Sequence, residues 1–198
     1  MSDQPRRKLP GFAIALAALV VLAVIGAGTA WFMQGGAPTI GGPFKLVNGE
    51  GRPVTDRDFR GHYLLVYFGY TFCPDVCPTT LNQVAEALDK LGPKGEQVQP
   101  LFITVDPKRD TPQVVGQYVA AFSPRLVGLT GTPEEIAKVA REYRVYYAIH
   151  KTAGAPGDYT VDHSSILYLM SPSGAFIAPI RADQSGAEMA KDIARHLS

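Results

Sequence analysis

The sequence predicts an α/β domain in which a central mixed sheet is flanked by helices, preceded by one transmembrane helix at the amino terminus. Short, nearly continuous apolar runs rich in β-branched and aromatic residues predict buried strands. Segments with capping residues and helical apolar spacing alternate with them, and an uncharged stretch lies near the amino terminus. A length of 198 residues suits one domain with an appendage.

The uncharged stretch from Gly11 to Met33 has the length of a membrane anchor. At ~1.5 Å per residue it would span roughly 34 Å, enough to cross a hydrocarbon core of ~30 Å. Arg6, Arg7 and Lys8 precede it, and basic flanks stay in the cytoplasm, so the rest of the chain is expected outside. A cleaved signal peptide is the alternative, but its apolar region would be only ~7–15 residues long. The expected division is residues 1–10 in the cytoplasm, 11–33 in the membrane, a Gly- and Pro-rich linker over 34–42, and one domain over 43–198.

The charge balance bears on the class of partner. The chain carries 19 basic and 18 acidic residues, a net charge of +1. Nucleic-acid-binding domains carry a basic excess that gathers on one face. The composition therefore predicts no nucleic-acid partner.

The first half of the domain has the pattern of a β-α-β unit. Phe44 to Val47 predicts a short strand, and Tyr63 to Tyr70, apolar almost throughout, predicts a buried central strand. The next helix has apolar residues at helical spacing from Leu81 to Leu91 and ends at Gly92-Pro93. Leu101 to Val105 predicts a second buried strand, and a strand–helix–strand crossover implies parallel pairing.

The second half contains three more helices and a hairpin. The helix start signals are Thr111 followed by Pro112, and two capping boxes, Thr132 with Glu135 and Ser185 with Glu188. Strands are predicted at Leu126 to Leu129 and, as a hairpin, at Ser165 to Met170 and Ala175 to Ile180. A parallel unit followed by a hairpin and a helix is the layout of a thioredoxin-like fold.

The two cysteines of the chain, Cys73 and Cys77, fall between the buried central strand and its helix. Pro78 suits the first helical position, which would place Cys77 at the N-cap. A helix amino terminus carries partial positive charge and lowers the pKa of a thiol there. Such thiolates serve redox exchange or metal ligation. A static disulfide or a buried structural pair is the plain alternative, although a disulfide closing so small a loop stabilises little.

The spacing of the cysteines favours a metal. Thioredoxin-type redox motifs have two residues between the cysteines, and this chain has three, which leaves room for an ion. Two soft thiolates suit Cu(I), with an imidazole as an acceptable third ligand, whereas structural zinc sites use four protein ligands. Further ligands must therefore come from elsewhere in the chain.

His163 is the best placed of the four histidines. It opens the strand predicted from Ser165 to Met170, at the same end of the sheet as the cysteine loop. Asp162 beside it could orient the ring, or could simply be solvated. The other three have no clear partner, and they are His62, His150 and His196.

Two further groups accompany the cysteine loop. Lys108, Arg109 and Asp110 follow the second strand at the same end, and we expect either a solvated turn or a rim on which a partner docks. Four aromatic residues in and after the buried central strand are expected to form core and to cover the cysteine site. They are Tyr67, Phe68, Tyr70 and Phe72.

Three blocks of the sequence resemble the Sco/SenC family. They are Tyr67 to Pro78, containing both cysteines; Val105 to Pro112; and Asp158 to Ser165, containing His163. The blocks come in the order of the family, and the resemblance runs from about Phe44 to the carboxyl terminus.

The resemblance implies that Cys73, Cys77 and His163 bind one copper ion, as Cu(I) or Cu(II). It implies a role in assembling the dinuclear copper site of cytochrome c oxidase, with the copper-bearing subunit as a partner. A periplasmic copper donor or thiol–disulfide partner is also implied. The short amino terminus favours a bacterial inner-membrane protein with its domain in the periplasm.

Two other activities stay open at this point. Some family members look more like thiol–disulfide oxidoreductases that keep the oxidase cysteines reduced, with Cys73 and Cys77 as the redox pair. A peroxidase is a third reading, because a cysteine between a strand and a helix also occurs in peroxiredoxin-like sites. A disulfide between the two cysteines could not ligate copper as two thiolates, so oxidation would switch binding off.

Overall fold

The computed structural model describes residues 16, 19–26, 29, 40–151 and 159–197, and residues 39–198 form one compact unit. The predicted cytoplasmic segment, residues 1–10, lies outside the described residues. So do most of the predicted anchor, 11–33, and of the linker, 34–42. In the part of the chain that is described, no helix has the length and apolar character needed to cross a membrane.

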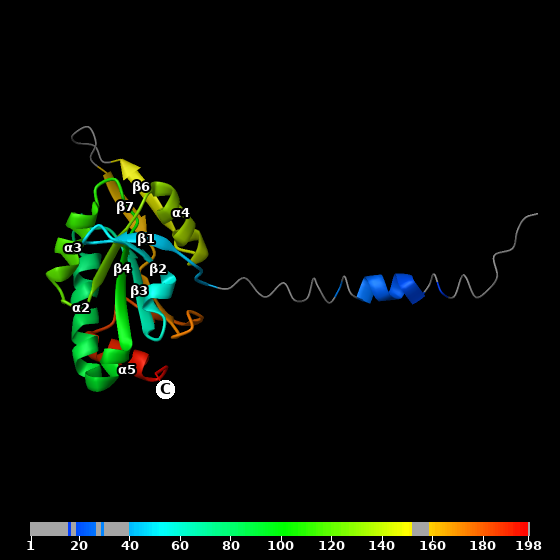
Figure 1. The fold of residues 1–198 in the computed structure, drawn as a ribbon. Coiled ribbons are helices and arrows are strands. Elements are labelled where there is room, and N and C mark those ends of the chain that lie inside the picture. The colour runs from blue at the N-terminus through cyan, green and yellow to red at the C-terminus, as the bar shows by residue number, and fades with distance from the viewer. Residues whose placement is uncertain (1–15, 17–18, 27–28, 30–39, 152–158, 198) are drawn as a thin grey trace, which may run out of the picture. The chain divides into compact units, whose positions relative to one another are not determined.

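A seven-stranded sheet forms the centre of the described domain (Figure 1), in the order β2-β1-β5-β4-β3-β8-β9. The neighbours β3, β4 and β5 run parallel, while β1, β8 and β9 pair antiparallel, so the sheet is mixed as predicted. The strands are β1 (Lys45–Asn48), β2 (Pro53–Thr55), β3 (Tyr63–Gly69), β4 (Val98–Thr104), β5 (Val127–Thr130), β8 (Ile166–Met170) and β9 (Phe176–Arg181).

Helices cover both faces of the sheet. Figure 1 shows α2 and α3 on one side and α4 on the other, and α5 packs with α2. The helices are α2 (Val76–Leu91), α3 (Pro112–Ala120), α4 (Pro133–Glu142) and α5 (Gly186–Ala194), with 3-10 turns η1 (Asp56–Phe59) and η2 (Gly92–Gln97). The three start signals are confirmed: the hydroxyls of Thr111, Thr132 and Ser185 each accept a hydrogen bond from the N–H three residues on. The fold is thioredoxin-like.

The central strand β3 is buried on both faces. Its residues alternate between the two cores: Leu65 and Tyr67 pack toward α2, α3 and α5, whereas Val66 and Phe68 pack toward α4. All four are at most 1% exposed. Each such buried side chain contributes about 1.5–3 kcal/mol of transfer free energy, which explains why an apolar run without polar alternation forms a strand here.

The sequence prediction lacked the short strand β2 and a two-stranded sheet of β6 (Tyr147–Lys151) and β7 (Tyr159–His163). Figure 1 shows this small sheet at the end of the domain opposite to α5. Most of its side chains are exposed or half-buried, so its apolar pattern is weak, and Val161 is the one fully buried residue. The prediction that His163 opens the following strand was therefore wrong, because His163 ends β7 and β8 begins at Ile166.

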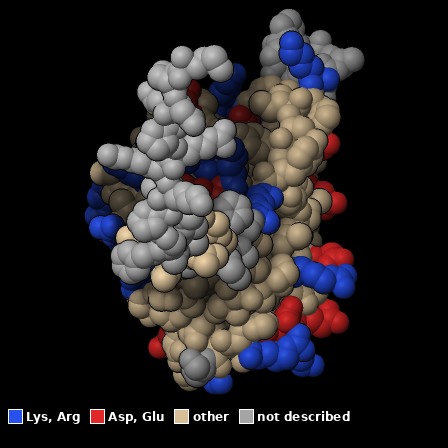
Figure 2. All heavy atoms as spheres, turned by 90° about the vertical axis from the view of Figure 1, so that its right-hand side faces the viewer, with Lys and Arg blue, Asp and Glu red and all other residues tan. Residues whose placement is uncertain are grey.

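Charged side chains of both signs are interspersed on the face that Figure 2 displays, most clearly along its lower right edge. This distribution agrees with the near balance of 19 basic and 18 acidic residues.

Gly69, the last residue of β3, sets how closely α2 approaches the sheet. A Cβ at this position would lie 2.7 Å from Cys77 Sγ and 2.9 Å from Phe102 Cε2. Neither neighbour has room to retreat, since both are fully buried. We therefore expect Gly69→Ala to lower the free energy of unfolding by about 1–3 kcal/mol, the cost of overpacking a core, and to expose the Cys77 thiol.

Urea denaturation and the rate of Cys77 modification by a thiol reagent would test this expectation. The control is Gly51→Ala, where φ is +78° and a Cβ meets nothing within 4 Å, so that backbone strain of about 1–2 kcal/mol is the only cost. The control should leave the Cys77 rate unchanged. Equal Cys77 rates in the two variants would contradict the role assigned to Gly69.

Candidate metal centre

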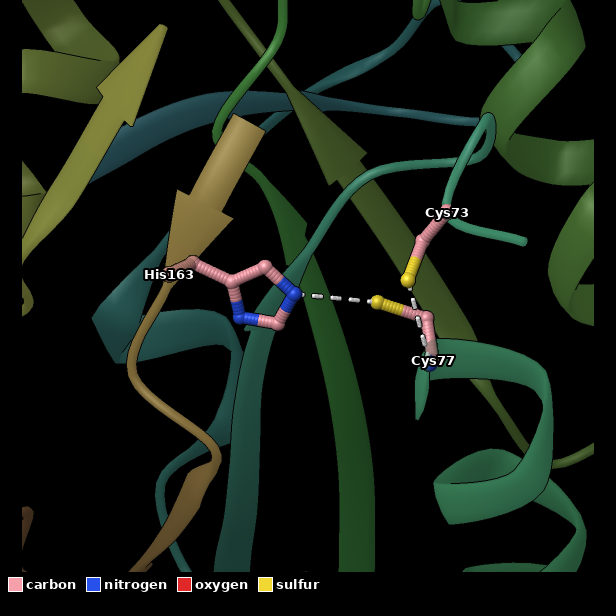
Figure 3. A group of neighbouring side chains, drawn as sticks. All are labelled: Cys73, Cys77 and His163. Carbon is pink, nitrogen blue, oxygen red and sulfur yellow. Dashed lines mark hydrogen bonds between the residues drawn. The ribbon is translucent and has the colours of Figure 1, made fainter. Parts of the chain in front are cut away.

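The cysteine loop joins β3 to α2, and the helix starts earlier than predicted. Asp75 is the N-cap and Val76 the first helical residue, so Cys77 lies inside the first turn and Pro78 follows it there. Proline is tolerated because the first four N–H groups of a helix have no partner within it. The N-cap side chain makes no capping hydrogen bond. Instead the Cys77 N–H donates to Cys73 Sγ at 3.4 Å, so the first cysteine caps the helix with its sulfur (Figure 3).

The two thiols differ in environment. Cys73 is half-buried, whereas Cys77 is fully buried against β3. A hydrogen bond from the Cys77 thiol, supported by hydrogen bonds from backbone N–H groups, holds the pKa of Cys73 far below its ordinary value. The same hydrogen bond and burial raise the pKa of Cys77. The reduced site therefore contains one thiolate, Cys73, and one thiol, Cys77.

His163 approaches the cysteines from the end of β7, which pairs with β6 through Tyr147. Figure 3 shows its ring pointing at the pair, with Nε2 3.2 Å from Cys77 Sγ. The other ring nitrogen, Nδ1, lies 3.2 Å from the Ser164 carbonyl oxygen. A carbonyl only accepts, so this contact assigns the proton of the neutral ring to Nδ1 and leaves the Nε2 lone pair facing the sulfurs.

The three side chains fit a single soft metal ion. Cys73 Sγ, Cys77 Sγ and a ring nitrogen of His163 all lie within 4.8 Å of one another. With ligand bonds of about 2.0–2.3 Å, the donors of a trigonal site lie roughly 3.5–4 Å apart, so small side-chain movements suffice. Two thiolates and one imidazole form a donor set that suits Cu(I), and imidazole also suits Cu(II).

Aromatic rings enclose the group on the domain side. The Tyr67 hydroxyl lies 3.7 Å from Cys77 Sγ, and the rings of Tyr67 and Tyr70 stand edge-on to His163 at 5.9 and 6.0 Å between centroids. Burial first, and the nearby Cys77 next, raise the pKa of Tyr67, so its hydroxyl remains a donor. The expectation that these aromatics form core and cover the site is confirmed for Tyr67 and Tyr70. Phe68 forms core only, and Phe72 is 61% exposed.

The loop after β4 was expected to be either a solvated turn or a docking rim, and the solvated turn is wrong for Asp110. Asp110 is fully buried, and its carboxylate accepts hydrogen bonds from the Thr71 N–H at 3.0 Å, the Thr71 hydroxyl at 2.6 Å and the Thr104 hydroxyl. Burial raises the pKa of Asp110 despite these bonds. Because Thr71 is two residues from Cys73, Asp110 ties the cysteine loop to the end of β4. Lys108 alone of the three is solvated.

The remaining sequence candidates lie away from the cysteines. His150 pairs with Asp162 across β6 and β7, 3.0 Å apart and both exposed. Asp162 therefore does not orient His163, a task that falls to the Ser164 carbonyl. A backbone acceptor carries no side-chain signal, so sequence reasoning could not have found it.

The fold and this dithiol–imidazole group define a thioredoxin-like protein with a candidate soft-metal centre at the amino terminus of its first large helix. The chain belongs to the SCO1/SenC family, whose model matches residues 33–198. It is 51% identical over 143 residues to protein SCO1 homolog 1, mitochondrial, of Arabidopsis thaliana, an alignment that covers 72% of this chain and 42% of that protein. The chain spans 57% and 54% of the mouse and human SCO1 homologues that it also matches.

Solved structures show the same similarity. Bradyrhizobium japonicum ScoI with copper bound superposes with a TM-score of 0.72 at 45% identity, covering 80% of this chain and 99% of that one. Yeast Sco1 with copper bound gives a TM-score of 0.74 at 38% identity, covering 80% and 88%.

The lowered pKa of Cys73 predicts how the reduced protein reacts. Since Cys73 is a thiolate well below neutrality, its alkylation rate should stay flat between about pH 5 and 8, where an ordinary thiol of pKa ~8.5 gains about tenfold per unit. Cys77→Ala removes the main donor to the thiolate, raises the pKa of Cys73 and should restore the pH dependence. Peptide mapping of alkylated protein measures both rates. A wild-type rate that climbs with pH like that of an ordinary thiol would contradict the hydrogen bond.

Proposed function

We propose that this protein is a copper metallochaperone that binds one copper ion through Cys73 Sγ, Cys77 Sγ and His163 Nε2. The observation that carries the proposal is the convergence of these three donors within 4.8 Å at a partly open helix terminus. Copper-bound structures of the similar Bradyrhizobium and yeast proteins support the choice of ion. Family membership supports a role in assembling the copper site of cytochrome c oxidase, with its copper-bearing subunit as the acceptor.

The three donors have separate tasks in this proposal. The half-buried Cys73 thiolate receives the ion before the buried Cys77, which loses its proton on binding and holds the ion against the core. His163 supplies the third donor from a different segment of the chain. Delivery needs no redox step, because donors of the acceptor replace the three side chains one at a time and the oxidation state of the copper is unchanged.

A thiol–disulfide oxidoreductase is the second candidate, favoured by the activation of Cys73 beside the buried Cys77. The Cys73 thiolate would attack a partner disulfide and release one partner thiolate. Cys77 would then lose its proton and attack the Cys73 sulfur, releasing the second partner thiolate and leaving a Cys73–Cys77 disulfide. The partner is reduced by two electrons and the dithiol is oxidised by two.

We place this activity at the bacterial inner membrane, with residues 11–33 as a single-pass anchor and the domain in the periplasm. The uncharged stretch and the basic residues before it support this placement. A copper donor or a thiol–disulfide partner would then meet the domain in the periplasm. Protease accessibility of the domain in spheroplasts tests the orientation, and a domain protected there would contradict it.

Copper titration of the full chain in detergent tests the metal proposal. The reduced wild type should bind about one copper with a thiolate-to-Cu(II) charge-transfer band, as a mononuclear two-thiolate and imidazole site requires. Cys73→Ser/Cys77→Ser should abolish the band, and His163→Ala should weaken Cu(II) binding because one of three donors is lost. His150→Ala is the matched control, since that histidine is exposed on β6 and pairs only with Asp162 among the described contacts.

The outcome separates the two candidate functions. Wild-type binding that both site variants lose and the control retains would establish the copper site. No thiolate-to-copper band in the wild type, together with a disulfide that cycles readily with a partner, would sink the copper proposal and leave the oxidoreductase.

A further inference from the structure

The strand that carries His163 needs a support outside its own small sheet. Among the described residues β6 and β7 pair only with each other and not with the seven-stranded sheet. Val161 buries its side chain in the core beneath α4, Tyr159 packs half-buried against the same core, and the backbone of Val161 hydrogen-bonds Tyr70. The contacts of Val161 lie in the middle of β7, so the start of the strand needs a separate contact to fix its distance from the cysteine loop.

Arg109 makes contacts on both sides of that gap. Its Nη1 donates to the Tyr159 carbonyl at 3.1 Å, and its guanidinium lies over the Tyr159 ring at 3.7 Å from the centroid. On the other side the same guanidinium lies 4.8 Å from the centroid of Phe72. Tyr159 starts β7, four residues before His163, and Phe72 directly precedes Cys73.

Asp106 anchors this arrangement to the main sheet. It lies two residues after the end of β4 and is 1% exposed. One carboxylate oxygen accepts from Arg109 Nε, and the other accepts from the Tyr159 hydroxyl at 2.6 Å. The backbone N–H of Asp106 donates to the Thr104 hydroxyl at 2.9 Å, which fixes the aspartate to the end of the strand. The three side chains Asp106, Arg109 and Tyr159 therefore form a closed, charge-assisted network.

We infer that Arg109 is a positioning residue that sets the distance between His163 and the two cysteines. The clamp, defined as Asp106, Arg109, Tyr159 and Phe72, joins the start of β7 to the cysteine loop through one planar cation. The inference rests on the proposed function in so far as copper is the ion bound. When the clamp is intact, His163 Nε2 faces the sulfurs; when it opens, the two cysteines keep their positions and the imidazole is withdrawn.

Two features of the chemistry support a positioning role. A guanidinium can stack between two rings and use its fork at the same time, which the ammonium of lysine cannot do. The cysteine loop has its own anchor in Asp110, so loss of the clamp should move β7 rather than the loop. The clamp therefore controls the third donor, which Cu(II) needs more than Cu(I), since two soft thiolates already suit Cu(I).

The test uses Arg109→Lys and Tyr159→Phe in the full chain, each with a small change in size. The apo proteins are compared by hydrogen exchange of the backbone amides of β7, and the loaded proteins by Cu(I) and Cu(II) competition titrations. Both variants should exchange faster at Tyr159–His163 than the wild type. Their Cu(II) affinity should fall by about 10–100-fold, the range for groups that orient metal ligands, while Cu(I) affinity falls much less.

Arg125→Lys is the matched control. Arg125 is also half-buried, and it donates to the Gly95 and Val98 carbonyls at the opposite end of β4, so its loss costs stability without touching the clamp. It should leave β7 exchange and both copper affinities unchanged. The inference would be overturned if the β7 amides of Arg109→Lys exchanged at the wild-type rate. It would also be overturned if Arg109→Lys and Arg125→Lys lost Cu(I) and Cu(II) affinity to the same extent.

Failure of the proposed function would look different from failure of the clamp. A wild type that binds no copper would refute the metal proposal, while the exchange measurement on apo protein would still decide whether Arg109 holds β7. If the wild type binds copper and Arg109→Lys has the same β7 exchange and the same copper affinities, the clamp alone is refuted.

Discussion

The direct contact between the end of β3 and the first turn of α2 is the constraint on which the rest of the site depends. Gly69 has no side chain, so Cys77 Sγ packs against the strand and is fully buried. This contact turns the first N–H groups of α2 toward the loop, where Cys73 Sγ accepts one of them. The lowered pKa of Cys73 and the raised pKa of Cys77 follow from this geometry, because one sulfur receives hydrogen bonds and the other provides one.

Buried acidic groups hold the surrounding loops in place. Asp110 binds Thr71 in the cysteine loop, and Asp106 binds Tyr159 at the start of β7. Both aspartates follow β4, so one rigid strand end organises the two segments that supply the donors. A carboxylate without partners would be costly at such depth, and each of these is satisfied by several donors. The donors of the site therefore lie on a loop, the first turn of α2 and the end of β7, and a few hydrogen bonds hold these segments in place.

The same arrangement serves both proposed activities. A thiolate near solvent backed by a buried thiol is suited to disulfide exchange, and the addition of an imidazole makes the pair a soft-metal site. Formation of a disulfide removes both sulfur ligands at once, so the redox state of the pair would decide whether copper can bind. Under the two proposals, one pair of cysteines would both respond to redox state and hold the metal.

The sequence by itself determined the strands and helices of the central β-α-β unit, the carboxyl-terminal hairpin, the three capped helix starts, and the two cysteines with His163 as candidate ligands. Local signals sufficed for these features, because apolar runs, caps and residue types act over a few neighbours. Only the tertiary structure decided that α2 begins at Val76, that β6 and β7 pair, and that Asp106 and Asp110 are buried. These features depend on partners distant in the chain, and a polar residue in sequence looks the same whether it is solvated or satisfied inside.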